Sequence, residues 1–115
     1  MFERSKVILV PFPFTDLSSS KVRPAVIVSE PKYMDQDVSV LFISSHLPKR
    51  KGSTDLWLKS SDPHFEKTGL KLDSLIKCNK IATLDKRIIL GEMGYLHQEV
   101  QKKVDEKLKL ALGLD

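Results

Sequence analysis

The feature of this chain that most constrains its fold is a succession of short apolar segments, each of about strand length. β-branched residues are frequent in them and turn-forming residues separate them, which is the pattern of β-strands joined by loops. Strands are expected at residues 6–12 (KVILVPF), 23–29 (RPAVIVS), 37–45 (DVSVLFISS), 55–59 (DLWLK), 72–83, with a bend, and 87–90. The third is apolar on both faces, so we expect it at the centre of the sheet.

The last part of the chain has a different period. From about residue 97 the apolar positions recur at helical spacing: Val100, Val104, Leu108 and Ala111. Gly113 stands just beyond the last of them, where glycine commonly ends a helix. The sequence therefore predicts a mainly β fold with helices, in which a small curled barrel of five to six strands carries a C-terminal amphipathic helix. One domain over residues 1–115 is expected.

Charge and cysteine content narrow the function classes. The 19 Lys and Arg residues outnumber 15 acids, which gives a net charge of +4 and a mild preference for polyanionic partners. The single cysteine, Cys78, excludes a disulfide within the chain and fits a reducing compartment. No apolar run approaches a membrane span, and no signal-peptide pattern opens the chain. The expected location is cytoplasmic, with no membrane partner.

The familiar catalytic motifs are missing from the sequence. His46, His64 and His97 are scattered, and neither HExxH nor CxxC occurs, so we expect no metal site and no cofactor. The five glycines form no phosphate-binding loop, and there is no GxSxG. Nothing marks a Ser–His–Asp triad, although sequence alone leaves one open.

Several blocks, in order, resemble the MazF/PemK family of toxins from type II toxin–antitoxin systems. The most specific is VILVPFPFTDLSSSKVRPAVIVS at residues 7–29, in which a polar loop leads to an Arg-Pro step that begins an apolar strand. The others are ISS at 43–45, LDSLI at 72–76, KIATLDK at 80–86 and the tail VDEKLKLALGL. The resemblance covers nearly the whole chain. It departs at Ser5-Lys6, where the family usually has Gly-Asp, and at Asn79-Lys80, where acidic or amide residues are common.

The resemblance implies an SH3-like barrel of the MazF/PemK/CcdB type and a homodimer. It also implies a toxin that inhibits growth as a metal-independent, sequence-specific endoribonuclease, cleaving single-stranded RNA (mRNA) by 2′-OH attack, until a cognate antitoxin protein neutralises it. The family's active-site pair is the arginine of the Arg-Pro step and a hydroxyl residue that ends the third strand. These positions are Arg23 and Ser44 here.

The same residues suit that chemistry. The planar guanidinium of Arg23 can donate two charge-assisted hydrogen bonds to a phosphate, and Ser44 can orient a phosphate or sugar oxygen. His46, two residues beyond, is a candidate acid, base or base-stacking residue. The candidate RNA-binding residues are Phe14, Thr15, Lys21, Ser45, His46, Lys49, Arg50, Asn79 and Lys80. The simpler alternatives are a strand-end hydroxyl that bonds its own backbone at Ser44 and a solvated loop at residues 49–51.

Two rival functions stay open on the sequence. One is a gyrase-poisoning toxin on the same fold, a branch that ends in an aromatic-glycine tail, whereas this chain ends Leu-Gly-Leu-Asp. The other is a non-catalytic RNA- or partner-binding barrel, because a shared fold does not fix function. Incubating the protein with a long single-stranded RNA in EDTA separates all three.

Overall fold

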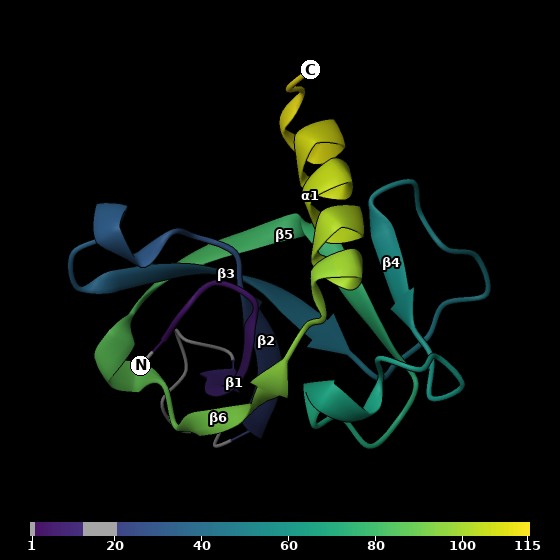
Figure 1. Ribbon diagram of the computed structural model, residues 1–115, viewed down its shortest axis with the longest axis horizontal. Helices are drawn as coiled ribbons and strands as arrows, with labels where there is room; N and C mark the ends of the chain where they lie inside the picture. The colour runs from purple at the N-terminus through teal and green to yellow at the C-terminus, as the bar shows by residue number, and fades with distance from the viewer. Residues whose placement is uncertain (1, 13–20) are drawn as a thin grey trace.

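Six strands and one α-helix make up the part of the chain that the computed structural model describes, residues 2–12 and 21–115 (Figure 1). The strands are β1 (Lys6–Phe12), β2 (Lys21–Ile27), β3 (Asp37–Ser44), β4 (Asp55–Leu58), β5 (Ser74–Asp85) and β6 (Gly91–Tyr95), and the helix is α1 (Gln98–Leu112). They form one antiparallel sheet in the order β4-β5-β3-β2-β1-β6. The first five expected strands are confirmed to within two residues, and β3 lies inside the sheet, as its two apolar faces predicted.

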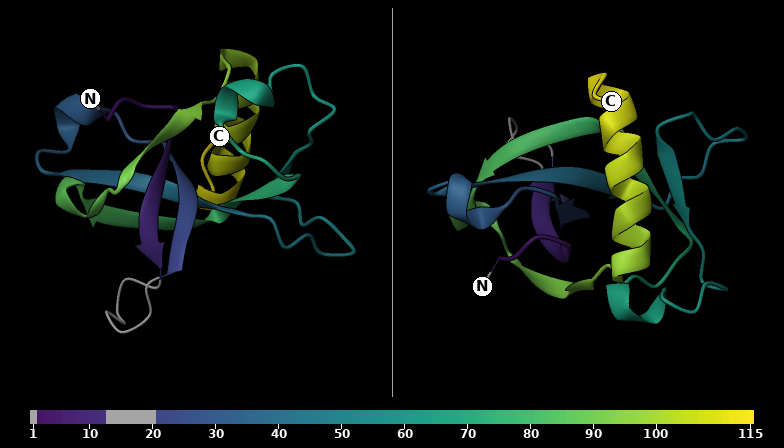
Figure 2. Two further views of the ribbon diagram at one scale, coloured as in Figure 1. Left: turned by 90° about the horizontal axis from the view of Figure 1, so that it is seen from below. Right: turned by 45° about the horizontal axis from the view of Figure 1, so that its top comes forward.

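The sheet is strongly curled (Figure 2). It buries apolar side chains on both faces. On β3, Leu41 and Ile43 point into the core that α1 covers, together with Val100 and Val104 of the helix. The alternate residues of β3, among them Val40, point into a second core on the opposite face. This double burial explains why the β3 sequence lacks a polar face.

β5 bends where it passes β3. Leu41 pairs with Ile81 but Ile43 pairs with Ile76, so β5 needs five residue steps where β3 needs two. The extra length also exchanges the two faces of β5, since Cys78 belongs to the core under α1 whereas Leu84 belongs to the opposite core. The bend expected from the sequence is confirmed.

The prediction of a strand at residues 87–90 is wrong. Residues Lys86–Ile88 form a 3-10 turn, η3, in which the Asp85 carboxylate accepts a hydrogen bond from the Arg87 backbone N–H. The last strand begins at Gly91 instead. A Cβ on Gly94 of this strand would lie 2.2 Å from the Lys67 carbonyl oxygen. Glycine there allows the turn η2 (Glu66–Thr68) to pack against this edge strand.

The C-terminal helix is confirmed and has well-defined ends. At its start the His97 Nδ1 accepts from the Glu99 backbone N–H, and at its end Gly113 adopts a φ of 71° and donates to backbone carbonyls of the last turn. In the described part of the chain, no helix is long and apolar enough to cross a membrane.

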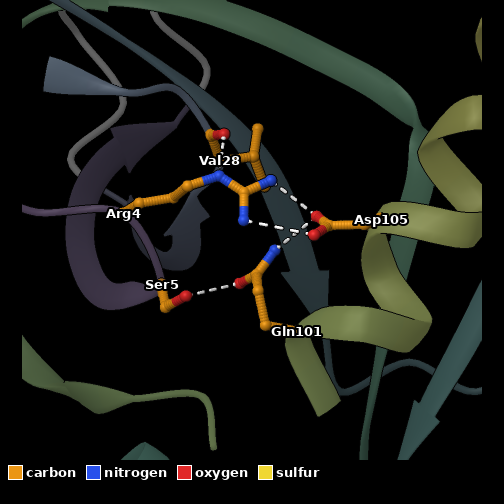
Figure 3. Close-up of polar contacts among 5 residues, drawn as sticks. All are labelled: Arg4, Ser5, Val28, Gln101 and Asp105. Atoms are coloured by element: carbon orange, nitrogen blue, oxygen red, sulfur yellow. Dashed lines mark hydrogen bonds and ion pairs between the residues drawn. The ribbon is translucent and has the colours of Figure 1, made fainter. Parts of the chain in front are cut away.

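A polar network ties the N-terminal segment to α1 (Figure 3). The Arg4 Nε donates to the Val28 carbonyl at 2.8 Å, and its guanidinium also pairs with Asp105. The Ser5 hydroxyl donates to Gln101 Oε1 at 2.7 Å. Ser5 has a φ of 77°, in the left-handed region that favours glycine. The hydrogen bond holds serine at the position where the resembling family usually has glycine.

Candidate active site

Arg23 and Ser44 lie on neighbouring central strands. Ala25 of β2 is the partner of Phe42 of β3, and continuing this antiparallel register by two residues places Arg23 opposite Ser44. Directly opposite residues on an antiparallel pair have Cβ atoms about 5 Å apart. Both side chains are half-buried, and both lie on the sheet face away from α1, since Ala25 belongs to the core on that side.

The Ser44 hydroxyl has a fixed role in the strand end. Its Oγ accepts a hydrogen bond of 3.1 Å from the His46 backbone N–H. This is the local contact that the simpler reading of Ser44 expected, and it does not consume the hydroxyl proton. Because one lone pair is already occupied, the geometry favours Ser44 as a hydrogen-bond donor to a bound ligand.

An open cleft of about 570 Å³ surrounds this pair. Its lining combines β2, the end of β3 and the bent part of β5, and consists of Arg23, Phe42, Ile43, Ser44, His46, Lys77, Asn79, Lys80 and Ile81. The structure thus brings together five of the predicted site residues, which come from three separate segments of the sequence. Three of the lining residues, Arg23, Lys77 and Lys80, have positively charged side chains, so the cleft suits an anion.

The other predicted residues lie elsewhere. Ser45 lines a second hollow of about 280 Å³, which also reaches Arg23. Lys21 is exposed at the start of β2, and Lys49 and Arg50 are exposed in the loop between β3 and β4. None of these three lines the main cleft as described. Phe14 and Thr15 fall outside the described residues.

The sequence reasoning missed four of the cleft residues, namely Phe42, Ile43, Lys77 and Ile81. Lys77 is two residues before Asn79 on β5, so strand alternation was the signal that could have placed both on one face. Phe42 and Ile43 belong to a strand that is apolar on both faces, so nothing in the sequence marks them as cleft residues. Ile81 is an apolar residue beside the bend of β5. Ile81 is 40% exposed in the structure.

Two of the histidines that are scattered in the sequence meet in the fold. The rings of His64 and His97 stack with centroids 3.7 Å apart and planes at 9°, and His64 Nε2 lies 3.2 Å from a Glu99 carboxylate oxygen. This donor set resembles a metal site. However, ring nitrogens bind metals within the ring plane, and two parallel planes at this spacing do not converge on one ion. As placed, the trio joins the start of α1 to the segment before η2.

Cys78 is fully buried in the core under α1. Burial raises the pKa of its thiol to about 11. A thiol that stays protonated at neutral pH is a poor nucleophile, so Cys78 is a packing residue.

Comparison with known proteins gives a consistent answer. A sequence model of the PemK-like, MazF-like toxins of type II toxin–antitoxin systems matches residues 3–112. An endoribonuclease in complex with its cognate antitoxin from a mycobacterial species is 22% identical, with a TM-score of 0.73 over 98% of this chain and 96% of that one. The Mycobacterium tuberculosis toxin MazF-mt6 is 19% identical, with a TM-score of 0.72 over 96% and 98%. The MazE-MazF complex (Form-II) from Deinococcus radiodurans is 16% identical, with a TM-score of 0.75 over 98% and 96%. At these identities the structural likeness establishes the fold, which is the one predicted.

Proposed function

The chain belongs to the family of PemK-like, MazF-like toxins of type II toxin–antitoxin systems, and on this premise we propose that it is an endoribonuclease that cleaves single-stranded RNA in the Arg23–Ser44 cleft. The observation that carries the proposal is the cross-strand placement of Arg23 and Ser44 in a cleft that also holds two lysines. It is the expected catalytic pair in a setting that attracts phosphate.

The reaction needs no group outside the RNA as its nucleophile. The 2′-hydroxyl oxygen attacks the adjacent phosphorus, the bond to the 5′-oxygen breaks, and that oxygen takes a proton. Negative charge collects on the phosphoryl oxygens between these events. The Arg23 guanidinium is suited to this charge because its fork donates two charge-assisted hydrogen bonds at once. Each well-placed donor of this kind typically contributes roughly 3–4 kcal/mol to transition-state stabilisation.

The neighbours of Arg23 supply the remaining contacts. Ser44 donates its hydroxyl proton to a phosphoryl oxygen, as its contact with the His46 backbone favours. Lys77 and Lys80 of the cleft add positive charge around the phosphate. The His46 imidazole is exposed beside Ser44, and histidine is the side chain that exchanges protons near neutral pH. We assign to it one of the two proton transfers, either from the 2′-hydroxyl or to the 5′-oxygen.

Cleavage of a long single-stranded RNA by wild type, Arg23→Ala and Arg23→Lys tests the proposal. We expect Arg23→Ala to lower the rate about a thousandfold, and Arg23→Lys to restore little, because lysine lacks the bidentate fork. Arg87→Ala is the matched control, since Arg87 is an exposed arginine that pairs with Asp85 and does not line the cleft. It should cut at the wild-type rate.

Two results would contradict the assignment. If a folded Arg23→Ala protein cuts RNA normally, Arg23 is not catalytic. If wild type leaves every RNA intact, a non-catalytic barrel or a toxin with a different target replaces the endoribonuclease. Circular dichroism of each variant separates loss of fold from loss of chemistry.

The partners follow from the same premise. A mycobacterial structural relative is an endoribonuclease in complex with its cognate antitoxin, and we infer that an antitoxin also binds this chain and restrains it. An acidic, partly disordered segment would suit the basic cleft, because such segments wrap large surfaces and fold on binding. We further infer a homodimer that acts in the cytoplasm, where its mRNA substrate is found.

A further inference from the structure

The segment that connects β4 to β5, residues 59–73, borders the candidate active site. Its residues 70–72 line the second hollow, which Arg23 also lines. At the base of the segment, the Asp73 carboxylate accepts a hydrogen bond of 2.6 Å from the Ser60 backbone N–H. The position of this connecting segment therefore determines one wall of the hollow beside Arg23.

The middle of the connecting segment is held to α1 by two stacked imidazoles and a carboxylate, the histidine clasp (His64, His97 and Glu99). The ring centroids of His64 and His97 lie 3.7 Å apart, and His64 Nε2 lies 3.2 Å from a Glu99 carboxylate oxygen. The His97 Nδ1 also accepts a hydrogen bond of 3.1 Å from the Glu99 backbone N–H, which caps the helix. Since a ring nitrogen accepts only while it carries no proton, this cap requires a neutral His97.

The closed clasp accommodates one proton. A proton on His64 is favourable, because the charged ring then donates to the Glu99 carboxylate. A proton on His97 is unfavourable, because its Nδ1 no longer accepts from the backbone and its charge lies at the positive end of the helix dipole. Protonation of both rings would also place two like charges face to face at 3.7 Å.

Other charged groups lie close in sequence to the clasp, but they belong to residue types that titrate outside the range of imidazole. Besides Glu99 they are Asp62, Glu66 and Lys67 on the connecting segment, Tyr95 at the end of β6, and Lys102 and Lys103 on α1. Carboxyl groups change charge at about pH 4, and lysine and tyrosine at about pH 10, whereas imidazoles titrate between about pH 5 and 8. At the base of the segment, the hydrogen bond from the Ser60 backbone N–H holds the pKa of the Asp73 carboxyl below its usual value, so that contact persists at about pH 5.

We propose that the histidine clasp is an acid-sensitive device that holds the connecting segment on α1 at neutral pH and releases it in acid. The closed clasp binds one proton, whereas two separated histidines bind two. The open state therefore binds more protons, and by linkage acid favours opening, by up to about tenfold per pH unit for one proton. Release moves the wall of the hollow beside Arg23. The inference does not depend on the reaction proposed for the cleft.

Amide hydrogen exchange of the whole chain, followed by NMR, measures this opening directly. The reporters are the backbone N–H groups of Phe65, Thr68 and Gly69, which donate hydrogen bonds within the segment. Their protection factors, which correct for the intrinsic effect of pH on exchange, should fall about tenfold or more between pH 7 and pH 5. The amides of the central strand β3 report global unfolding and should change less.

His97→Asn is the decisive variant. Asparagine caps helices well but does not titrate, so the closed and open states bind the same number of protons. The pH dependence of the three reporters should then disappear. His46→Asn makes the same change at a histidine outside the clasp and should preserve the wild-type fall in protection.

Two results would overturn the proposal. One is unchanged protection of the wild-type reporters between pH 7 and pH 5, and the other is an equal fall in His97→Asn. A melting curve checks first that His97→Asn is folded, and His97→Ser, which also caps a helix, takes its place if it is not. Neither result depends on RNA cleavage, so the clasp and the proposed function are tested separately.

Discussion

Ser5 provides a test of how the N-terminal segment is held on the barrel. Its φ of 77° costs a non-glycine residue about 1–2 kcal/mol, and its hydroxyl donates to Gln101, which is only 6% exposed. Ser5→Ala keeps the unfavourable backbone and leaves the buried Gln101 oxygen without its partner. We expect the free energy of unfolding to fall by about 1–3 kcal/mol, the usual cost of an unsatisfied buried group.

Ser5→Gly separates the two contributions. It loses the same hydrogen bond but no longer has an unfavourable backbone conformation, which raises stability. The greater freedom of glycine in the unfolded chain cancels about 0.5–1 kcal/mol of that increase. The glycine variant should therefore be more stable than the alanine variant by about 1 kcal/mol. For a chain of this size that difference corresponds to roughly 4 °C in Tm. Wild type should be at least as stable as either variant.

The measurement is urea and thermal unfolding of the three proteins, followed by circular dichroism. Ser61 is the control position, because it is exposed and is not among the described residues with positive φ. Its glycine variant should be no more stable than its alanine variant. The reasoning is refuted if Ser5→Ala is as stable as Ser5→Gly. In a Gln101→Leu background the hydrogen bond is already absent, so the cost of Ser5→Ala should shrink.

The remaining predictions concern pH, metal, charge and assembly. Burial raises the pKa of Asp105, but hydrogen bonds from Arg4 and Gln101 outweigh it, and the pKa of this carboxyl lies below its usual value. A lowered folded pKa stabilises the fold above the unfolded value near pH 4, and this stability is lost as pH falls through the folded value. Asp105→Asn should thus lower Tm at neutral pH and flatten its decline in acid; an unchanged acid limb in a Tm-against-pH series would contradict this. RNA cleavage should persist in EDTA, and metal-dependent recovery of an EDTA-inactivated protein would overturn the mechanism. Lys49→Glu with Lys51→Glu should weaken both RNA cleavage and antitoxin binding. Wild-type values for both would show that the loop at residues 49–51 contacts neither partner. Light scattering at micromolar concentration should give about twice the 13.1 kDa of one chain, and a monomer mass would exclude the dimer.

Much of the fold was predictable because its signals are local. β-branched segments and the helical period of Val100 and Val104 are readable within a few residues, and the double-faced apolar pattern placed β3 inside the sheet. The last strand was misplaced because Gly94 is required by a contact with Lys67, which is 27 residues earlier in the sequence. The sequence pattern placed the strand before Gly91, whereas the strand begins at Gly91 and the packing of η2 requires glycine at position 94 within it.

The candidate site divides in the same way. Arg23 and Ser44 were found through resemblance, and the strand register explains why two residues so distant in sequence lie together. Phe42 was missed because a strand that is apolar on both faces gives no sign of which apolar residue borders a cleft. Ile81 was missed because its exposure depends on the register shift between β5 and β3, which no local pattern specifies. The stacking of His64 on His97 likewise depends on the packing of the segment before η2 against the start of α1. No short sequence pattern predicts that tertiary contact.

The additional length in β5 has a consequence for how this protein can diverge. Ile76 and Ile81 pair with β3 on either side of the bend. The pairing of β5 with β3 therefore does not depend on the residues between them. Asn79 and Lys80 can then be exchanged without disturbing a paired neighbour. Point mutations in two adjacent codons would therefore change the chemistry of the cleft on an unchanged scaffold. Duplicated copies of such a gene could in this way diverge at the cleft while folding identically.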